Sequence, residues 1–101
     1  MKRLLVFLLL LPIGAMAYPG QIIRSFKTPG NYPAGLTFDG KNLWVTDRMR
    51  NEIYMVDPTR GSAVLITKAP GGSAADFTWD GKHLWNVDFE DTKIYELKAL
   101  D

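Results

Sequence analysis

The chain has 101 residues, of which 12 are basic and 11 acidic, and it contains no cysteine. The lack of cysteine excludes disulfide bonds, cysteine-ligated metals and a cysteine nucleophile. The formal net charge of +1 gives no basic excess of the kind that nucleic-acid binding needs, so nucleic acid is not expected as a partner.

Residues 1–17 are predicted to be a signal peptide. Two basic residues near the start are followed by the apolar run 4–11 and by the small-residue cleavage site 15–17. The apolar run is too short to span a bilayer, which takes about 20 residues, and this argues against a retained membrane anchor. We therefore expect a secreted or periplasmic protein that comprises residues 18–101 and has no membrane anchor after cleavage.

The rest of the sequence repeats itself once, with an offset of 41 residues. The segment 33–47, PAGLTFDGKNLWVTD, returns as 74–88, AADFTWDGKHLWNVD. A period near 40 is typical of a four-stranded propeller blade or of a helical HEAT-type repeat. The two repeats are expected at about 34–68 and 75–101.

Local patterns favour strands over helices in both repeats. The runs 34–38 and 42–46 are rich in β-branched and aromatic residues, and an Asp-Gly turn between them is a strong hairpin signal. The apolar residues further along come in clusters and form no stripe at helical spacing. The predicted strands are 34–38, 42–46, 52–57, 63–68, 75–79, 83–87 and 93–98.

The segments 33–39, 43–47 and 51–54 together resemble the repeat of NHL-type and YncE-like β-propellers. Those families have a P-x-G-hydrophobic strand, a second strand that ends in Asp, and a third strand that opens with Asn-x-Ile. The second repeat departs from this pattern, with Ala74 at the place of the proline and Thr92 at the place of the asparagine.

The resemblance implies an all-β fold of two four-stranded antiparallel blades. Residues 21–27 align with the strand 63–68 and are expected to form a displaced strand, which in closed propellers completes the final blade. Such propellers have five to eight blades in one chain, and two blades alone would leave large apolar faces in water. We therefore expect self-association, with three copies giving six blades, or else a remnant of a longer propeller.

Alternate loops of such a sheet lie at the same end. The loops before strands 34–38 and 75–79 and the loops after strands 42–46 and 83–87 therefore share one end, where the candidate site is expected. Asp47 and Asp88 recur, so they either bind Ca²⁺ at a channel mouth or accept N–H bonds in their own turns. Asp76 occurs in one repeat only, at the start of a strand, and is therefore the more distinctive candidate, although a structural role is still favoured for it. His83, the only histidine, is expected at the opposite end and exposed to solvent. The candidate ligand-binding residues are Tyr32, Asp47, Arg48, Arg50, Asp76 and Asp88.

The sequence is interpreted as that of an exported binding or scaffold module that assembles into a closed ring. No catalytic residue and no metal ligand is assigned, and Ca²⁺ is the one cofactor considered. Whether the ligand is a protein or a small molecule is left open. The alternatives are an enzyme of the lyase, lactonase or glutaminyl-cyclase kind that is active only in the ring, and a truncated remnant without a function of its own.

Overall fold

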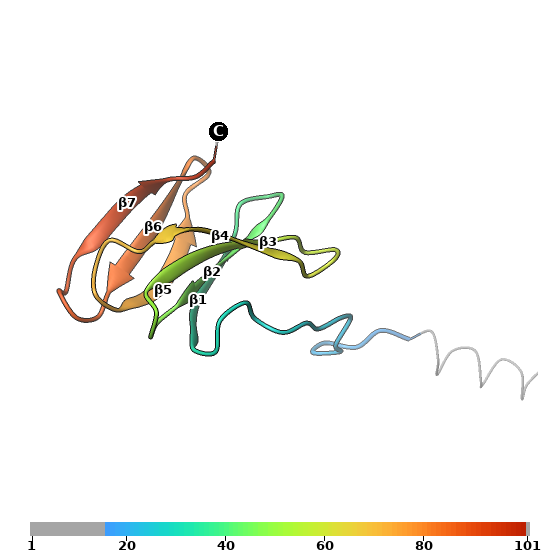
Figure 1. Cartoon of the computed structure of the whole chain (residues 1–101). Helices are drawn as coiled ribbons and strands as arrows, with labels where there is room; N and C mark the ends of the chain where they lie inside the picture. The colour runs from blue at the N-terminus through green and yellow to red at the C-terminus, as the bar shows by residue number, and fades with distance from the viewer. Residues whose placement is uncertain (1–15, 101) are drawn as a thin grey trace, which may run out of the picture.

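The computed structural model describes residues 16–100, so the predicted signal peptide lies almost entirely outside the described residues. Within this range no helix is long and apolar enough to cross a membrane. The strands, shown in Figure 1, are β1 (Pro33–Phe38), β2 (Leu43–Asp47), β3 (Glu52–Val56), β4 (Ala63–Lys68), β5 (Ala74–Trp79), β6 (His83–Asp88) and β7 (Ile94–Lys98).

These strands form two antiparallel sheets of consecutive strands, β1-β2-β3-β4 and β5-β6-β7. We call the first sheet unit 1 and the second unit 2, and residues 41 positions apart are counterparts. The predicted all-β fold is confirmed, and each strand bound lies within one residue of its expected place. The hairpin turns need Gly40 and Gly81, whose φ angles of 98° and 99° strain any other residue type.

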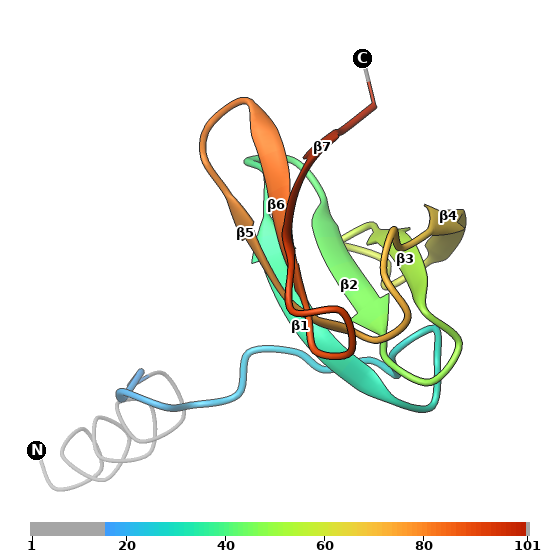
Figure 2. The same cartoon turned by 90° about the vertical axis from the view of Figure 1, so that its left-hand side faces the viewer.

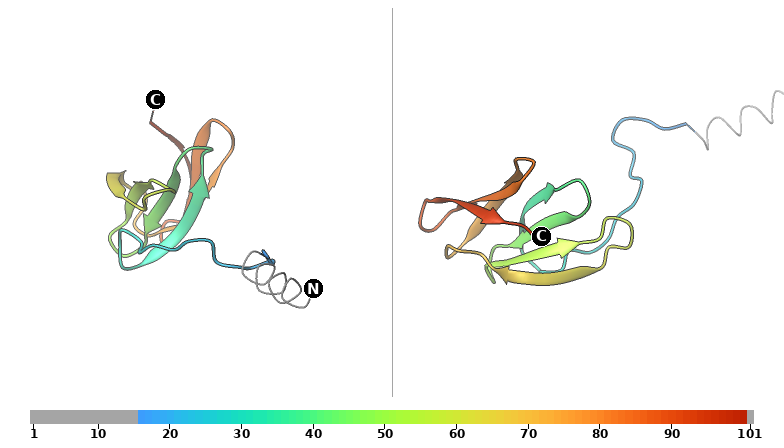
Figure 3. Two further views of the ribbon diagram at one scale, coloured as in Figure 1. Left: turned by 90° about the vertical axis from the view of Figure 1, so that its right-hand side faces the viewer. Right: turned by 90° about the horizontal axis from the view of Figure 1, so that it is seen from above.

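Unit 1 has four strands and unit 2 has three, in agreement with the three strands predicted for the second repeat, but the displaced strand expected at 21–27 does not form in this single chain. A strand needs a neighbouring edge to pair with, and β4 already occupies the edge of β3 in unit 1. The other candidate edge is β7. It lies across both sheets from the N-terminal segment, as Figures 1 and 3 show.

Each sheet has a front and a back face, because successive side chains of a strand point to opposite sides. Strand pairing places Leu36 and Leu43 on one face of unit 1 and Trp44 and Met55 on the other. Front-face residues are Leu36, Leu43, Val45 and Val56, with counterparts Phe77, Leu84, Asn86 and Leu97. Back-face residues are Trp44, Thr46, Ile53 and Met55, with counterparts Trp85, Val87, Ile94 and Glu96.

The core lies where the back face of unit 1 packs on the front face of unit 2, and Figure 2 shows β5 and β6 lying over β1 and β2. At the inner edge, β1 and β5 approach so closely that a Cβ on Gly35 would lie 2.8 Å from the Cα of Asp76. The core residues are Trp44, Ile53, Ala69, Ala74, Phe77 and Leu84.

Candidate functional site

Asp47 is a buried carboxylate that organises the turn between β2 and β3. Its Oδ1 accepts a bond from the backbone N–H of Arg50 at 2.8 Å, and its Oδ2 accepts one from the N–H of Tyr32 at 3.3 Å. The same carboxylate therefore ties the turn to the segment that leads into β1. Its geometry matches the turn role considered above.

Asp88 does the same in unit 2. Its Oδ1 accepts the N–H of Ser73 at 2.7 Å, and its Oδ2 accepts the N–H groups of Glu90 and Asp91 at 2.9 and 2.8 Å. Burial raises the pKa of Asp88, but the N–H donors of Asp91, Ser73 and Glu90 outweigh burial and bring this pKa below its usual value. The carboxylate is thus held ionised by N–H donors of its own loop and of the segment that leads into β5.

Tyr32 and Arg48 meet at the loop end between the two units. The backbone N–H of Arg48 donates to the carbonyl of Tyr32 at 2.8 Å, which fixes the two loops side by side. Both residues line a cavity of about 590 Å³ that opens between the units. The lining residues are Asn31, Tyr32, Pro33, Ala34, Arg48, Met49, Ala75 and Phe89.

Across the cavity mouth, the guanidinium carbon of Arg48 lies 5.8 Å from the ring centroid of Phe89. A cation at this distance over an aromatic face is attracted by about 0.5–1 kcal/mol at an exposed site. Arg48 and Phe89 occupy the same position of the two repeats. The contact therefore forms because the residue type at this position differs between the repeats. Tyr32, Met49 and Phe89 are all more than half exposed here.

The other two predicted residues lie outside the cavity lining. Arg50 is an exposed residue of the same turn as Arg48. Asp76 is exposed at the inner edge, where its carbonyl accepts the Nδ2–H of Asn86 at 2.9 Å. The Oδ1 of Asn86 is the one buried side-chain polar atom without a hydrogen-bond partner in the described part of the chain. The structure thus brings together Tyr32 and Arg48 but not Arg50 or Asp76.

Asn51, which the sequence marked only as part of the repeat pattern, forms a joint that holds the two units together. Asn51, with a left-handed φ of 56°, donates through Nδ2 to the carbonyls of Ala69 and Gly71. Its Oδ1 accepts the N–H of Ala74 at 3.0 Å. One side chain therefore fixes the connection from β4 to β5, and with it the position of the cavity walls. The counterpart, Thr92, makes no such bridge among the described residues.

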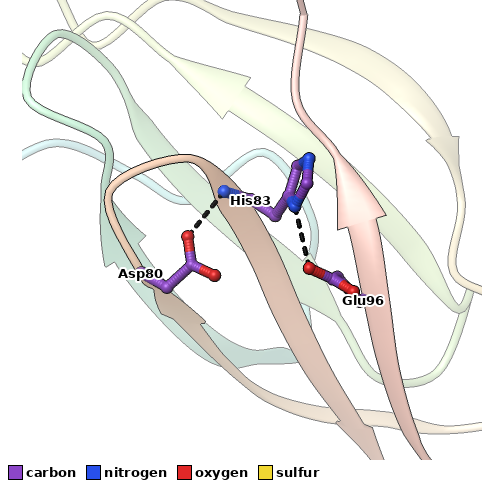
Figure 4. A group of neighbouring side chains, drawn as sticks. All are labelled: Asp80, His83 and Glu96. Carbon is purple, nitrogen blue, oxygen red and sulfur yellow. Dashed lines mark hydrogen bonds and ion pairs between the residues drawn. The ribbon is translucent and has the colours of Figure 1, made fainter.

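A separate cluster of Asp80, His83 and Glu96 lies at the opposite end, and Figure 4 shows its arrangement. The Nδ1 of His83 lies 2.8 Å from Glu96 Oε2, so this histidine is partly buried beside a carboxylate and not fully exposed as expected. The Oδ1 of Asp80 accepts the N–H of His83 at 2.7 Å, and its Oδ2 accepts the indole N–H of Trp85 at 2.7 Å.

The bonds of Asp80 are those of a turn residue, because Asp39 makes the same set in unit 1. Asp39 accepts the N–H of Asn42 at 2.7 Å and the indole N–H of Trp44 at 2.8 Å. The backbone N–H of His83, followed by the indole of Trp85, lowers the pKa of Asp80 to about 2. The closeness of Asp80 to the other two side chains follows from this turn.

Sequence reasoning missed Phe89 and Met49 as cavity residues, although both lie in loops assigned to the correct end. The sequence feature that could have identified these residues is that their residue types are not repeated between the units. Turn carboxylates and glycines repeat between the units, whereas Met49 has Glu90 as its counterpart, and Tyr32 has Ser73. Positions that differ on a repeated scaffold are the ones free to form a specific site.

No protein-family model and no curated protein matches the sequence. Among solved structures, the fold is similar to that of virginiamycin B lyase from Staphylococcus aureus, with a TM-score of 0.58 at 19% sequence identity. The match covers 83% of this chain and 33% of that one, so this chain spans about a third of its length. At this identity the likeness supports a propeller-type repeat fold and not one particular repeat family.

Proposed function

We propose that this protein is an exported, propeller-type binding module that binds a small ligand in the cavity between its two units. The observation that carries the proposal is the cavity of about 590 Å³ between loops that the turn carboxylates hold in place. Binding residues are commonly found on such loops, where a rigid scaffold presents them. The proposal keeps Tyr32 and Arg48 from the predicted set and adds Phe89.

The chemistry of the lining defines the ligand class. Arg48 offers a guanidinium that can pair with a carboxylate or phosphate, while Phe89 and Tyr32 offer aromatic faces. The described lining contains no carboxylate that would favour a cation. We infer a ligand that combines an anionic group with an aromatic or apolar body.

Chemical-shift mapping with benzoate and benzylamine, two probes with a similar ring and opposite charge, tests this. Benzoate should shift the amide signals of Ala34, Ala75 and Phe89, and benzylamine should not. Arg48→Ala should abolish the benzoate shifts, whereas Arg50→Ala removes an equal charge from the same turn outside the cavity and should preserve them. Equal shifts with both probes, or benzoate shifts that survive Arg48→Ala, would rule out this site.

The propeller-type likeness also supports assembly into a ring. The solved structure is about three times as long as the matched region, so three copies would supply a chain length similar to one such molecule. Light scattering on residues 18–101 should give the mass of a trimer. A monomer would favour the other hypothesis, a remnant of a longer propeller.

The second candidate is an enzyme that is active only in the assembled ring. It is favoured by the lyase named in the structural comparison, and Asp76 is then the residue to test, since it is exposed where the two inner strands meet. Asp76→Asn should remove any turnover that is found in the assembled protein. Unchanged turnover would remove this candidate residue.

Export is proposed from the signal-peptide pattern of residues 1–17. The intact mass of protein collected outside the cytoplasm should correspond to a chain that begins at Tyr18. A mass that includes residue 1 would contradict cleavage.

A further inference from the structure

The packing inside the chain leaves one face of each unit without a counterpart. In the described residues, the back face of unit 1 covers the front face of unit 2, while the front face of unit 1 and the back face of unit 2 have no unit against them. Leu36 and Ile94 are therefore 61% and 71% exposed, whereas Phe77 and Ile53, their counterparts, are 6% and 2% exposed. Apolar surface is thus open around Leu36 and around Ile94, whereas Val45 and Val56, also on the unit 1 front face, are already buried.

The N-terminal segment 24–29 lies over the front face of unit 1. It lies there in the same way as β4 lies over the front face of unit 2. A cavity of about 210 Å³ is lined by residues 66–68 and by Leu84 of the unit 2 front face. A larger cavity of about 380 Å³ is lined by residues 24–29 and by Leu43, the counterpart of Leu84. The segment thus follows the path of a fourth strand without the rest of its sheet.

The difference between these two cavities identifies what the larger one lacks. The smaller cavity has Trp44 and Ile53, from the back face of unit 1, in its wall. The larger cavity has no back-face residue in its wall among residues 16–100, and its lining is mostly apolar. The side chains that would complete it are the counterparts Trp85 and Ile94, which the chain carries on the open back face of unit 2.

The connection from this segment into β1 is also built like the connection from β4 into β5. The sequence Lys-x-Pro-Gly ends both segments, at 27–30 and at 68–71. A Cβ on Gly30 would meet the carboxylate of Asp47, and a Cβ on Gly71 would meet that of Asp88. The connection before unit 1 therefore has the shape of the connection between two stacked sheets, so a further sheet is expected to precede unit 1.

We propose that this other blade is unit 2 of a second copy of the chain. Its back face covers the front face of unit 1, and residues 22–27 pair as a fourth strand along its β7. The inference rests on the self-assembly proposed above and names the interface. Because each copy offers one open front face and one open back face, the contact is heterologous and can close into a ring.

The internal pairing sets the register of the exchanged strand. In unit 1, Met55 lies opposite Val64 across the antiparallel pair β3 and β4. Their counterparts are Glu96 and Ile23, so Ile23 of one copy lies opposite Glu96 of the next. Ile23 is exposed in the single chain. In the described residues β7 pairs with β6 along one edge only, so its other edge is available for pairing.

Cysteine cross-linking tests the register directly, because the protein has no cysteine of its own. Residues opposite one another in an antiparallel pair have Cα atoms about 4.5–5.5 Å apart, within disulfide range. Ile23→Cys combined with Glu96→Cys should give covalent oligomers on mild oxidation. Arg24→Cys combined with Glu96→Cys is the matched control, because neighbouring residues on a strand point to opposite faces.

Non-reducing gels and light scattering on the full mature chain separate the outcomes. Covalent oligomers in the Ile23 pair, at least tenfold more abundant than in the Arg24 pair, support the strand exchange. A stable oligomer with equal or no cross-linking in both pairs overturns the exchange and leaves the proposed assembly standing. A monomer in the absence of cross-linking overturns both.

Discussion

The two units have nearly the same sequence pattern and opposite environments. Ile53 is in the core of the protein and its counterpart Ile94 is exposed, although both lie near the start of the third strand of their sheet. Trp44 is buried and Trp85 is partly exposed, although both donate their indole N–H to a turn aspartate. Burial here depends on what is stacked on the sheet and not on the local sequence, so each unit serves as a control for the other.

The largest expected difference comes from shortening the two isoleucines. Ile53→Ala removes buried methyl groups between the sheets and should reduce the free energy of unfolding by about 2–5 kcal/mol. Ile94→Ala should change the free energy of unfolding of the dissociated chain by less than about 0.5 kcal/mol. Urea unfolding at low protein concentration measures both. Equal losses would show that unit 2 is covered even in the isolated chain.

The joint between the units gives the next largest effect. Asn51→Ala removes the bridge to Ala69, Gly71 and Ala74 and places alanine at a left-handed φ, so it should cost about 2–3 kcal/mol of unfolding free energy. Thr92→Ala, at the counterpart position, should stay within about 0.5 kcal/mol of the parent. Chemical unfolding monitored by tryptophan fluorescence compares the two, and a costly Thr92→Ala would contradict the asymmetry.

Acid should weaken the turn of unit 2 in a defined pH range. The N–H of His83 and the indole of Trp85 lower the pKa of Asp80 to about 2, below the value of about 3.9 for an unfolded chain. The ionised carboxylate therefore stabilises the fold above about pH 4, and this contribution is lost as the pH falls toward about 2. The urea midpoint should decline over this range and decline less in Asp80→Asn. An identical decline in that variant would place the acid sensitivity elsewhere.

The smallest expected effect is a gain. Thr92 is β-branched and has a left-handed φ of 58°, whereas its counterpart Asn51 belongs to the residue types that tolerate this conformation. Thr92→Asn should relieve this strain and raise the free energy of unfolding by a few tenths to about 1 kcal/mol. Thermal unfolding provides the measurement, with Thr92→Ser as a control that removes the branching methyl group without adding an amide.

The strands were predictable because their signals are local. Alternating and aromatic runs around an Asp-Gly turn specify a hairpin wherever the hairpin lies, and the repeat supplied each pattern twice. The fate of residues 21–27 was not predictable in this way. Whether they become a strand depends on an edge that the same chain does not bring to them.

The candidate site was predictable in part for the same reason. The loops at one end could be assigned from strand direction, and Tyr32 and Arg48 do lie there together. The cavity itself depends on the stacking of one sheet on the other, and the roles of Arg50 and Asp76 depend on where their side chains end up. Asp47 and Asp88 show that recurrence indicates a structural role more readily than a ligand site.

The joint formed by Asn51 and Gly71 also determines the curvature of any larger assembly. It fixes the rotation between one sheet and the next, because the amide bridges the connection and the glycine packs against the carboxylate of Asp88. The number of sheets that complete a full circle follows from that rotation. A change in the joint would therefore alter the symmetry of the proposed ring, whereas a change within a strand would alter only the stability of that ring.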